Sequence, residues 1–250
     1  RNGGIILESS QANKINMHNG AVSGVELWEG RTLNSKVVIS SLDPHTTFLD
    51  LVGPDNLPDN LRDSVQGWHW DKWSFNTLHV VSKEQPHYAC GDPWVDESFM
   101  TIFGFESTDQ VLAHWDNVVS GKVDTNILGG HSTCESFFDS HLVRKPGHQV
   151  SFFQMHAPYE IEGGWDTRGP ELEEAILAKW QRAAPNMTKD NIIKTAHETP
   201  VGIEIRLPNM RRGGIKHGDY KPIQLGCFRP NQDCSSSATP IEGLYTCGGS

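Results

Sequence analysis

Polar residues capable of proton transfer or anion binding gather shortly before the last apolar run of the sequence. They are His217, Asp219, Gln224 and Arg229. A histidine can move a proton near neutral pH, and an arginine can stand beside an anion or a carbonyl oxygen. The alternative is that these side chains make loop hydrogen bonds or carry surface charge. We therefore take His217 and Arg229 as candidate catalytic residues and keep a structural role as the other interpretation.

The apolar run that follows ends in two glycines. Residues from Ile241 to Cys247 favour a short buried strand, and Gly248 and Gly249 come directly after it. Glycine lets the backbone approach another group closely, because it has no Cβ. The pattern predicts either a strand that delivers the backbone to a ligand or a strand followed by an ordinary loop.

Aromatic residues form a second set of candidates. Trp68, Trp70 and Trp73 lie close together in the sequence, and Phe152 and Phe153 lie in a later apolar run. Aromatic side chains can line an apolar substrate cavity, although they more often fill a core. We expect Trp68, Trp70 and Phe153 to contact a substrate if such a cavity exists.

Composition excludes several classes of function. The 250 residues carry a net charge of −10, which argues against a nucleic-acid or anionic-membrane surface. No apolar run reaches the length of a membrane span. The five cysteines are widely spaced and form no C-x-x-C pair, which favours free thiols in a reducing compartment and predicts a cytoplasmic location. The first residue is Arg1, so the sequence itself leaves open whether a targeting segment was removed.

Potential metal ligands show no recognisable pattern. His131, Cys134, Asp139 and His141 occur in one polar stretch. Their spacing matches no tetrahedral zinc motif, so we expect scattered loop residues and no metal site.

The elements that must position these residues are both strands and helices. Residues 1–53 predict a β-rich module with a turn at Asn19-Gly20. Residues 74–82 and 149–155 predict strands, and the first of these has two mainly apolar faces, so we expect it to be covered on both sides. Residues 108–121 predict an amphipathic helix capped by Ser107 or Thr108, and a long helix ends before Ala184-Pro185-Asn186. The fold class is therefore mixed, α+β or α/β.

Several short motifs occur in a fixed order along the chain. They are Asn19-Gly20 to Val25, Ser40-Ser41-Leu42-Asp43-Pro44, Ala157-Pro158-Tyr159, Gly164-Trp165-Asp166, Ala184-Pro185-Asn186, Thr199-Pro200, His217-Gly218-Asp219, Gln224-Leu225, Arg229-Pro230 and Gly243-Leu244-Tyr245-Thr246-Cys247-Gly248. No single motif is specific, but their collinear order is. In this order the chain resembles the middle and C-terminal part of phytoene-desaturase-like and amine-oxidase-like FAD-dependent oxidoreductases.

The resemblance implies a division of the chain and a cofactor site. Residues 1–55 together with 226–250 would form part of an FAD-binding domain, and residues 56–225 a substrate-binding domain with a mixed sheet carrying helices. The backbone of Ala12 would contact the adenine. The resemblance places the segment that contains Gln224 near the flavin, so Gln224 is a substrate-binding candidate. The residues expected beside the flavin are Cys247, Gly248, Gly249 and Ser250.

One motif of the resembling family is missing. A G-x-G-x-x-G turn, which binds the FAD pyrophosphate at a helix N-terminus, does not occur in this sequence. We therefore expect a remaining N-terminal FAD-binding polypeptide of the same enzyme to act as a partner, and a peripheral membrane contact is a further expectation.

The resemblance implies FAD-dependent oxidation of an apolar or aromatic small molecule, first of all at a CH–CH bond. Amine or alcohol oxidation on the same scaffold stays open. So does a non-catalytic binding module on a degenerate flavoprotein fold.

Overall fold

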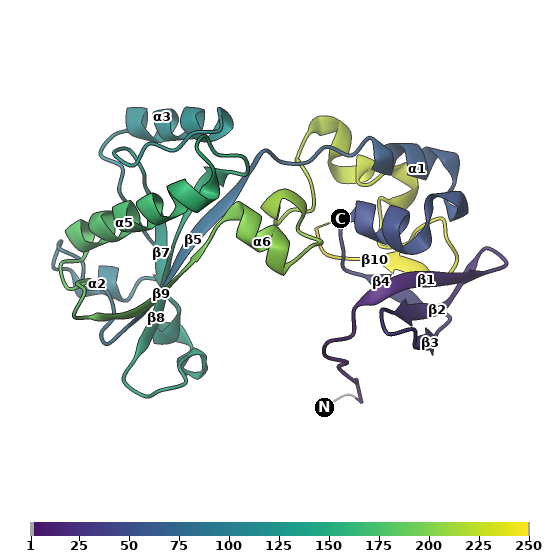
Figure 1. Cartoon of the computed structure of the whole chain (residues 1–250), viewed down its shortest axis with the longest axis horizontal. Helices are drawn as coiled ribbons and strands as arrows, with labels where there is room; N and C mark the ends of the chain where they lie inside the picture. Colours follow the sequence, from purple (N-terminus) through teal and green to yellow (C-terminus); the bar gives the residue numbers. More distant parts are fainter. Residues whose placement is uncertain (1–2, 250) are drawn as a thin grey trace. The chain divides into compact units, whose positions relative to one another are not determined.

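The structure is a computed structural model that describes residues 3–249 (Figure 1). The chain divides into two compact units. Unit 1 comprises the described residues up to 70 together with 209–211 and 215–249, and unit 2 comprises residues 71–208 and 212–214. The mixed fold class expected from the sequence is confirmed, because helices and sheets occur in both units.

Unit 1 begins with a three-stranded antiparallel sheet. Its strands are β1 (Ala12–His18), β2 (Ala21–Leu27) and β3 (Thr32–Asn34), in that spatial order. Asn19 and Gly20 join the first two strands with φ angles of 50° and 81°. Two positive φ angles are what a tight hairpin turn requires, so the turn expected from Asn-Gly is confirmed.

A second sheet of unit 1 joins segments from opposite ends of the chain. Strand β4 (Val38–Ser40) pairs in parallel with β10 (Leu244–Thr246), and Tyr245 lies opposite Ile39. Leu244 and Thr246 are buried. The expectation of a buried strand is wrong for the other face of β10, because Tyr245 is 40% exposed, and its neighbour Ile39 on β4 is 66% exposed.

Helices complete the core of unit 1, and the boundary of this unit differs from the one expected from the sequence. The π-helix η1 (His45–Val52) buries Phe48, and α1 (Asp59–Gln66) buries Leu61 and Val65 in the same cluster. Because these side chains have 0% exposure, α1 belongs to unit 1. Unit 1 therefore extends to Trp70 and resumes before residue 225, whereas the sequence placed the boundaries at 55 and 225.

Short 3-10 turns make up most of the remaining regular structure of unit 1. They are η2 (Pro54–Asn56), η5 (Pro222–Gln224), η6 (Gly226–Phe228) and η7 (Gln232–Cys234). The turn η4 (Arg211–Gly213) is divided between the two units.

Unit 2 is built on a five-stranded antiparallel sheet. Its strands are β5 (Trp73–Ser82), β6 (Thr101–Phe103), β7 (Gly130–Cys134), β8 (Gln149–Pro158) and β9 (Ile192–Glu198), in the spatial order β6-β7-β8-β5-β9. The helical elements of unit 2 are α2 (Pro93–Asp96), α3 (Thr108–Val119), α4 (Glu135–Phe138), η3 (Ser140–Leu142), α5 (Trp165–Ala183) and α6 (Pro200–Arg206).

One face of this sheet forms the core of unit 2. Leu78 of β5 and Phe153 of β8 pack in one cluster with Ile176 and Trp180 of α5. Phe153 is 0% exposed, and its ring centroid lies 5.0 Å from that of Phe103. The expected contact between Phe153 and a substrate is therefore corrected: Phe153 is a core residue.

The opposite face of the sheet is only half-buried. Trp73 and Phe75 of β5 and His156 of β8 form a ring cluster on it. Helix α3 reaches this cluster through Trp115, whose ring centroid lies 5.0 Å from that of Trp73. The expectation that β5 is covered on both sides is wrong for this face.

Helix α3 departs from its expected burial. Ser107 caps it as expected, since its hydroxyl accepts a hydrogen bond from the Gln110 amide at 3.3 Å. Of the apolar positions, Val118 is buried. Leu112 and Val119 are 58% and 53% exposed, so much of the predicted apolar face lies open. Among residues 3–249, no helix combines the length and apolarity that crossing a lipid bilayer requires.

The neighbours Phe152 and Phe153 provide a test of the two sheet faces. Phe153→Ala removes a fully buried ring and is expected to lower the free energy of unfolding by about 3–5 kcal/mol. Phe152→Ala removes a half-buried ring from the open face, and we expect a loss of about 1 kcal/mol. Chemical denaturation of both variants measures the difference. Equal losses would contradict the assignment of the faces.

Candidate functional site

The parallel pairing of β4 and β10 brings two turns to one edge. Parallel strands end at the same edge of a sheet, and ligands of open α/β sheets bind beyond the carboxyl ends of the strands. Here Ser41 follows β4, while Cys247 to Gly249 follow β10. The Cys247 amide donates a hydrogen bond to the Ser40 carbonyl oxygen at 2.9 Å, so the two turns leave the sheet side by side.

Gly248 leaves room at this edge. Its φ is 93°, a conformation that favours glycine. A Cβ on Gly248 would meet only the Ser41 carbonyl oxygen within 4 Å, at 3.8 Å. The space beside Gly248 is therefore not filled by the described residues.

A buried carboxylate lies at the end of β4. Asp43 is 0% exposed, and its two carboxylate oxygens accept hydrogen bonds from the Thr46 amide at 2.9 Å and the Thr46 hydroxyl at 2.6 Å. These bonds cap the first turn of η1. Arg211 Nε lies 3.7 Å from Asp43 Oδ1. Sequence reasoning read Asp43 only as part of a motif, and its signal was the position directly after a β-branched strand.

Arg229 holds the turn that follows β10. Its Nε donates to the Gly249 carbonyl oxygen at 2.8 Å, and its Nη atoms donate to the backbone carbonyls of Gln224 and Lys216. Its guanidinium carbon lies 5.0 Å from the ring centroid of Trp68 and 5.2 Å from that of Tyr220. Because these donors point at backbone oxygens, the structure indicates a positioning role for Arg229 in place of the expected catalytic one.

His217 lies against the same turn. It is 7% exposed, and its Cγ would be 3.7 Å from a Cβ on Gly249. Burial lowers the pKa of His217; the Asp43 carboxylate acts in the opposite direction, and the Arg229 charge lowers the pKa further. The imidazole is therefore mainly neutral at pH 7, the form that can accept a proton.

The backbone at His217 depends on Trp68. Trp68 Nε1 donates to the His217 carbonyl oxygen at 2.9 Å, and His217 has a φ of 56°. Gly218 follows with a φ of 131°, and a Cβ there would lie 2.2 Å from Trp68 Nε1. Only glycine fits at this position.

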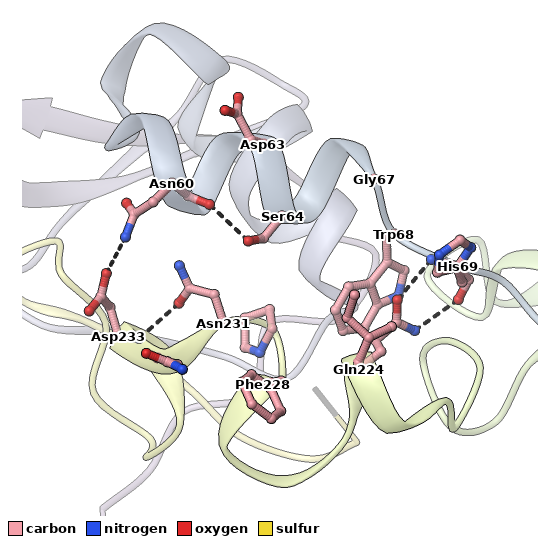
Figure 2. Close-up of a pocket in the computed structure, with 13 residues that line it drawn as sticks. Asn60, Asp63, Ser64, Gly67, Trp68, His69, Gln224, Phe228, Asn231 and Asp233 are labelled. Atoms are coloured by element: carbon pink, nitrogen blue, oxygen red, sulfur yellow. Dashed lines mark hydrogen bonds between the residues drawn. The ribbon is translucent and has the colours of Figure 1, made fainter.

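Gln224 fixes the segment from the other side. It is 4% exposed, and its Oε1 accepts from the His69 amide at 2.8 Å (Figure 2). Its Nε2 donates to the carbonyl oxygens of His69 and Asp219, each at 2.9 Å. The side-chain amide is thus occupied by backbone groups, and the expected substrate contact of Gln224 is corrected to a structural role.

The remaining expected residues are not all brought together. Ala12 begins β1, in a different sheet from β4 and β10. Trp70 packs beside η1, with its ring centroid 6.4 Å from that of His45 and 5.8 Å from the Arg211 guanidinium carbon. Ser250 lies outside the described residues. The residues that do converge are Trp68, His217, Gln224, Arg229, Cys247, Gly248 and Gly249.

Unit 2 carries a second candidate surface that sequence reasoning missed. On the open sheet face, the Phe152 ring centroid lies 6.2 Å from that of His79 and 5.7 Å from that of His131. Burial lowers the pKa of His131. Gln154 Nε2 donates to Thr77 Oγ1 at 2.9 Å on the same face. The signal was the period-two alternation of β5 and β8.

The described part of the chain contains no group of three or more His, Cys, Asp or Glu side chains that could hold a metal ion.

Comparisons with known proteins identify relatives of this chain, although no protein-family model matches it. The limonene dehydrogenase of Castellaniella defragrans includes one polypeptide that is 31% identical over 261 residues, which cover 98% of this chain and 47% of that polypeptide. Pyridine nucleotide-disulfide oxidoreductase domain-containing protein 2 of Rattus norvegicus is 27% identical over 240 residues, which cover 92% and 40%. The chain thus spans less than half the length of these relatives.

Solved structures share the fold. An oxidoreductase from Methanosarcina mazei superposes with a TM-score of 0.50 and 12% identity, over 96% of this chain and 44% of that one. A putrescine oxidase variant with redesigned cofactor binding gives a TM-score of 0.53 and 9% identity, over 96% and 42%. At these identities the likeness concerns the fold alone.

Two glycines with positive φ provide a matched test of the Trp68 contact. Gly218→Ala places a Cβ against the Trp68 indole and is expected to cost about 2–4 kcal/mol of unfolding free energy, from backbone strain and a lost hydrogen bond. Gly226→Ala, at a φ of 62° with nothing within 4 Å, is expected to cost about 1 kcal/mol. Chemical denaturation measures the unfolding free energy of both variants. Similar losses would contradict the contact between residue 218 and Trp68.

Proposed function

We propose that this chain, which belongs to the superfamily of FAD-dependent amine-oxidase-like and phytoene-desaturase-like flavoproteins, is the flavin-end and substrate-binding part of an FAD-dependent oxidoreductase. The observation that carries the proposal is the convergence of His217, Gly248 and Gly249 at the carboxyl edge of β4 and β10.

The residues at this edge suit one end of FAD. Gly248 has open space beside it, and the neutral imidazole of His217 lies against the adjoining Gly249. A planar ring or a polyol chain needs such close backbone approach. The pyrophosphate needs a glycine-rich turn, which these residues do not contain, so we propose that a further polypeptide portion of the same enzyme supplies it.

Within this function, the described residues position groups and handle protons. When bound, FAD supplies the redox chemistry by accepting two electrons from the substrate. Arg229 fixes the Gly249 carbonyl oxygen and so sets the course of the backbone beside the cofactor. His217 can accept a proton at this edge, at a ring nitrogen of its imidazole.

The open sheet face of unit 2 supports the proposed substrate class. Its aromatic rings and half-buried histidines suit an apolar or aromatic small molecule. The similarity to one polypeptide of a limonene dehydrogenase supports a hydrocarbon substrate. We propose oxidation at a CH–CH bond. All five cysteines are free thiols, which supports the proposal of a cytoplasmic location.

Flavin content tests the glycine edge. In the intact protein, Gly248→Val is expected to lower the flavin bound per protein at least tenfold, because its side chain occupies the open space and strains a positive φ. Gly147→Val is the matched control, since Gly147 has a φ of 82° and nothing within 4 Å but lies in unit 2. Flavin absorbance after gel filtration measures both. Normal flavin content in Gly248→Val would refute the proposed cofactor edge.

Turnover tests His217. In the intact protein, His217→Asn is expected to keep normal flavin content and to lower turnover by about 10²–10⁴-fold, as for a lost general base. Asparagine is chosen because it tolerates the positive φ of this position. Anaerobic bleaching of the flavin by limonene gives the rate.

The pH dependence adds a second readout. The neutral imidazole is the proposed active form, so the rate of the unaltered protein should fall as the pH drops through the lowered pKa of His217, and His217→Asn should lose this dependence. A His217→Asn protein with an unchanged rate and pH profile would show that His217 moves no proton in the reaction.

A further inference from the structure

A cavity lies inside unit 1, between α1 and the segment that contains η5 to η7 (Figure 2). Its volume is about 400 Å³, within the range of small-molecule sites. One face of α1 forms a wall through Asn60 and Ser64, and Phe228 and Asn231 form the wall opposite. Trp68, which follows the C-terminal end of α1, also lines it.

Asn231 presents a fixed donor to this cavity. It is 8% exposed, and its Oδ1 accepts hydrogen bonds from the Asp233 and Cys234 amides, each at 3.1 Å. Two N–H donors require the side-chain oxygen on that side, so the NH₂ group must be on the other. Nδ2 has no protein partner among residues 3–249, and Figure 2 shows it directed towards the cavity. This amide donor opens onto the cavity, where the acceptor of a ligand can bond it.

Acceptors stand near this donor. Asp233 Oδ2 accepts a hydrogen bond from Asn60 Nδ2 at 2.5 Å, which leaves Oδ1 with acceptor capacity. Ser64 Oγ donates to the Asn60 carbonyl oxygen at 2.8 Å, and its lone pairs stay available. This part of the cavity thus combines the donor Asn231 Nδ2 with the acceptors Asp233 Oδ1 and Ser64 Oγ.

The rest of the wall is mixed, because Asp63, His69, Gln224 and Gln232 line it together with apolar residues. Phe228 and Ile223 are 44% and 73% exposed, and Trp68 adds an indole face. Within the described chain no lysine or arginine lines the cavity, so nothing there attracts an anion. The Asp63 carboxylate points away from it in Figure 2, and Asp233 Oδ2 is bonded by Asn60. An ammonium group has no acceptor for Asn231 Nδ2, so it cannot complete the site.

We propose that this cavity binds a small uncharged molecule with an apolar body and a hydroxyl group. A hydroxyl both donates and accepts: it donates to Asp233 Oδ1 or Ser64 Oγ and accepts from Asn231 Nδ2. The apolar body lies between Phe228 and Trp68. The site is distinct from the proposed cofactor edge, although Trp68 contacts both.

Calorimetric titration of the intact protein with three probes of one size tests the ligand class. The probes are benzyl alcohol, toluene and benzylammonium. Benzyl alcohol is expected to bind about tenfold more tightly than toluene, because toluene leaves Asn231 Nδ2 without an acceptor. Equal binding of toluene, tighter binding of benzylammonium, or no binding of benzyl alcohol would each overturn the proposal.

Three variants locate the binding. Asn231→Asp keeps an oxygen for the Asp233 and Cys234 amides but removes the donor, and we expect about tenfold weaker binding of benzyl alcohol. Ser64→Leu fills the cavity from a half-buried helix position without touching that cap, and the same loss is expected. Gln66→Leu, at an exposed position of the same helix that does not line the cavity, is the control and should bind normally. Binding that survives both Asn231→Asp and Ser64→Leu would place the probe elsewhere and overturn the site.

Discussion

The parallel pairing of β4 with β10 is the interaction on which the candidate cofactor edge depends. Tyr245 lies opposite Ile39, and this register sets the turn after β10 beside the turn after β4. Arg229 then binds the Gly249 carbonyl oxygen, and His217 packs against Gly249. A two-stranded parallel sheet has few hydrogen bonds of its own. The surrounding hydrogen bonds of Arg229 and Gln224 therefore supply much of the order at this edge.

Sequence reasoning identified the residues of this edge better than their roles. The Asn19-Gly20 turn and the Ser107 cap could be predicted because both depend on local backbone chemistry. The convergence of His217 and Gly249 could be expected because motif order restricts topology. The role of Gln224 could not, because its partner His69 lies 155 residues away and their bond is invisible to periodicity.

Burial was the least predictable property. The alternation of β5 shows two apolar faces, but it cannot say that a helix packs on one face while the other stays half-exposed. For the same reason Phe152 and Phe153 look equivalent in sequence although Phe153 is a core residue. On α3, Leu112 and Val119 follow a helical apolar period and are nevertheless exposed. Periodicity therefore indicates which residues share a face, and the layers of the fold decide whether that face is covered.

The discontinuous course of unit 1 affects the order in which the protein can form during translation. Nearly all of unit 2 lies in one continuous segment, residues 71–208, which leaves the ribosome before β10 is made. Domains generally fold as units, and the N-terminal ones fold first during synthesis. Here the N-terminal part of unit 1 must wait, with β4 unpaired, until β10 emerges. While residues 41–243 are made, the nascent chain consequently exposes this edge of β4, which is a reason for a chaperone to hold it.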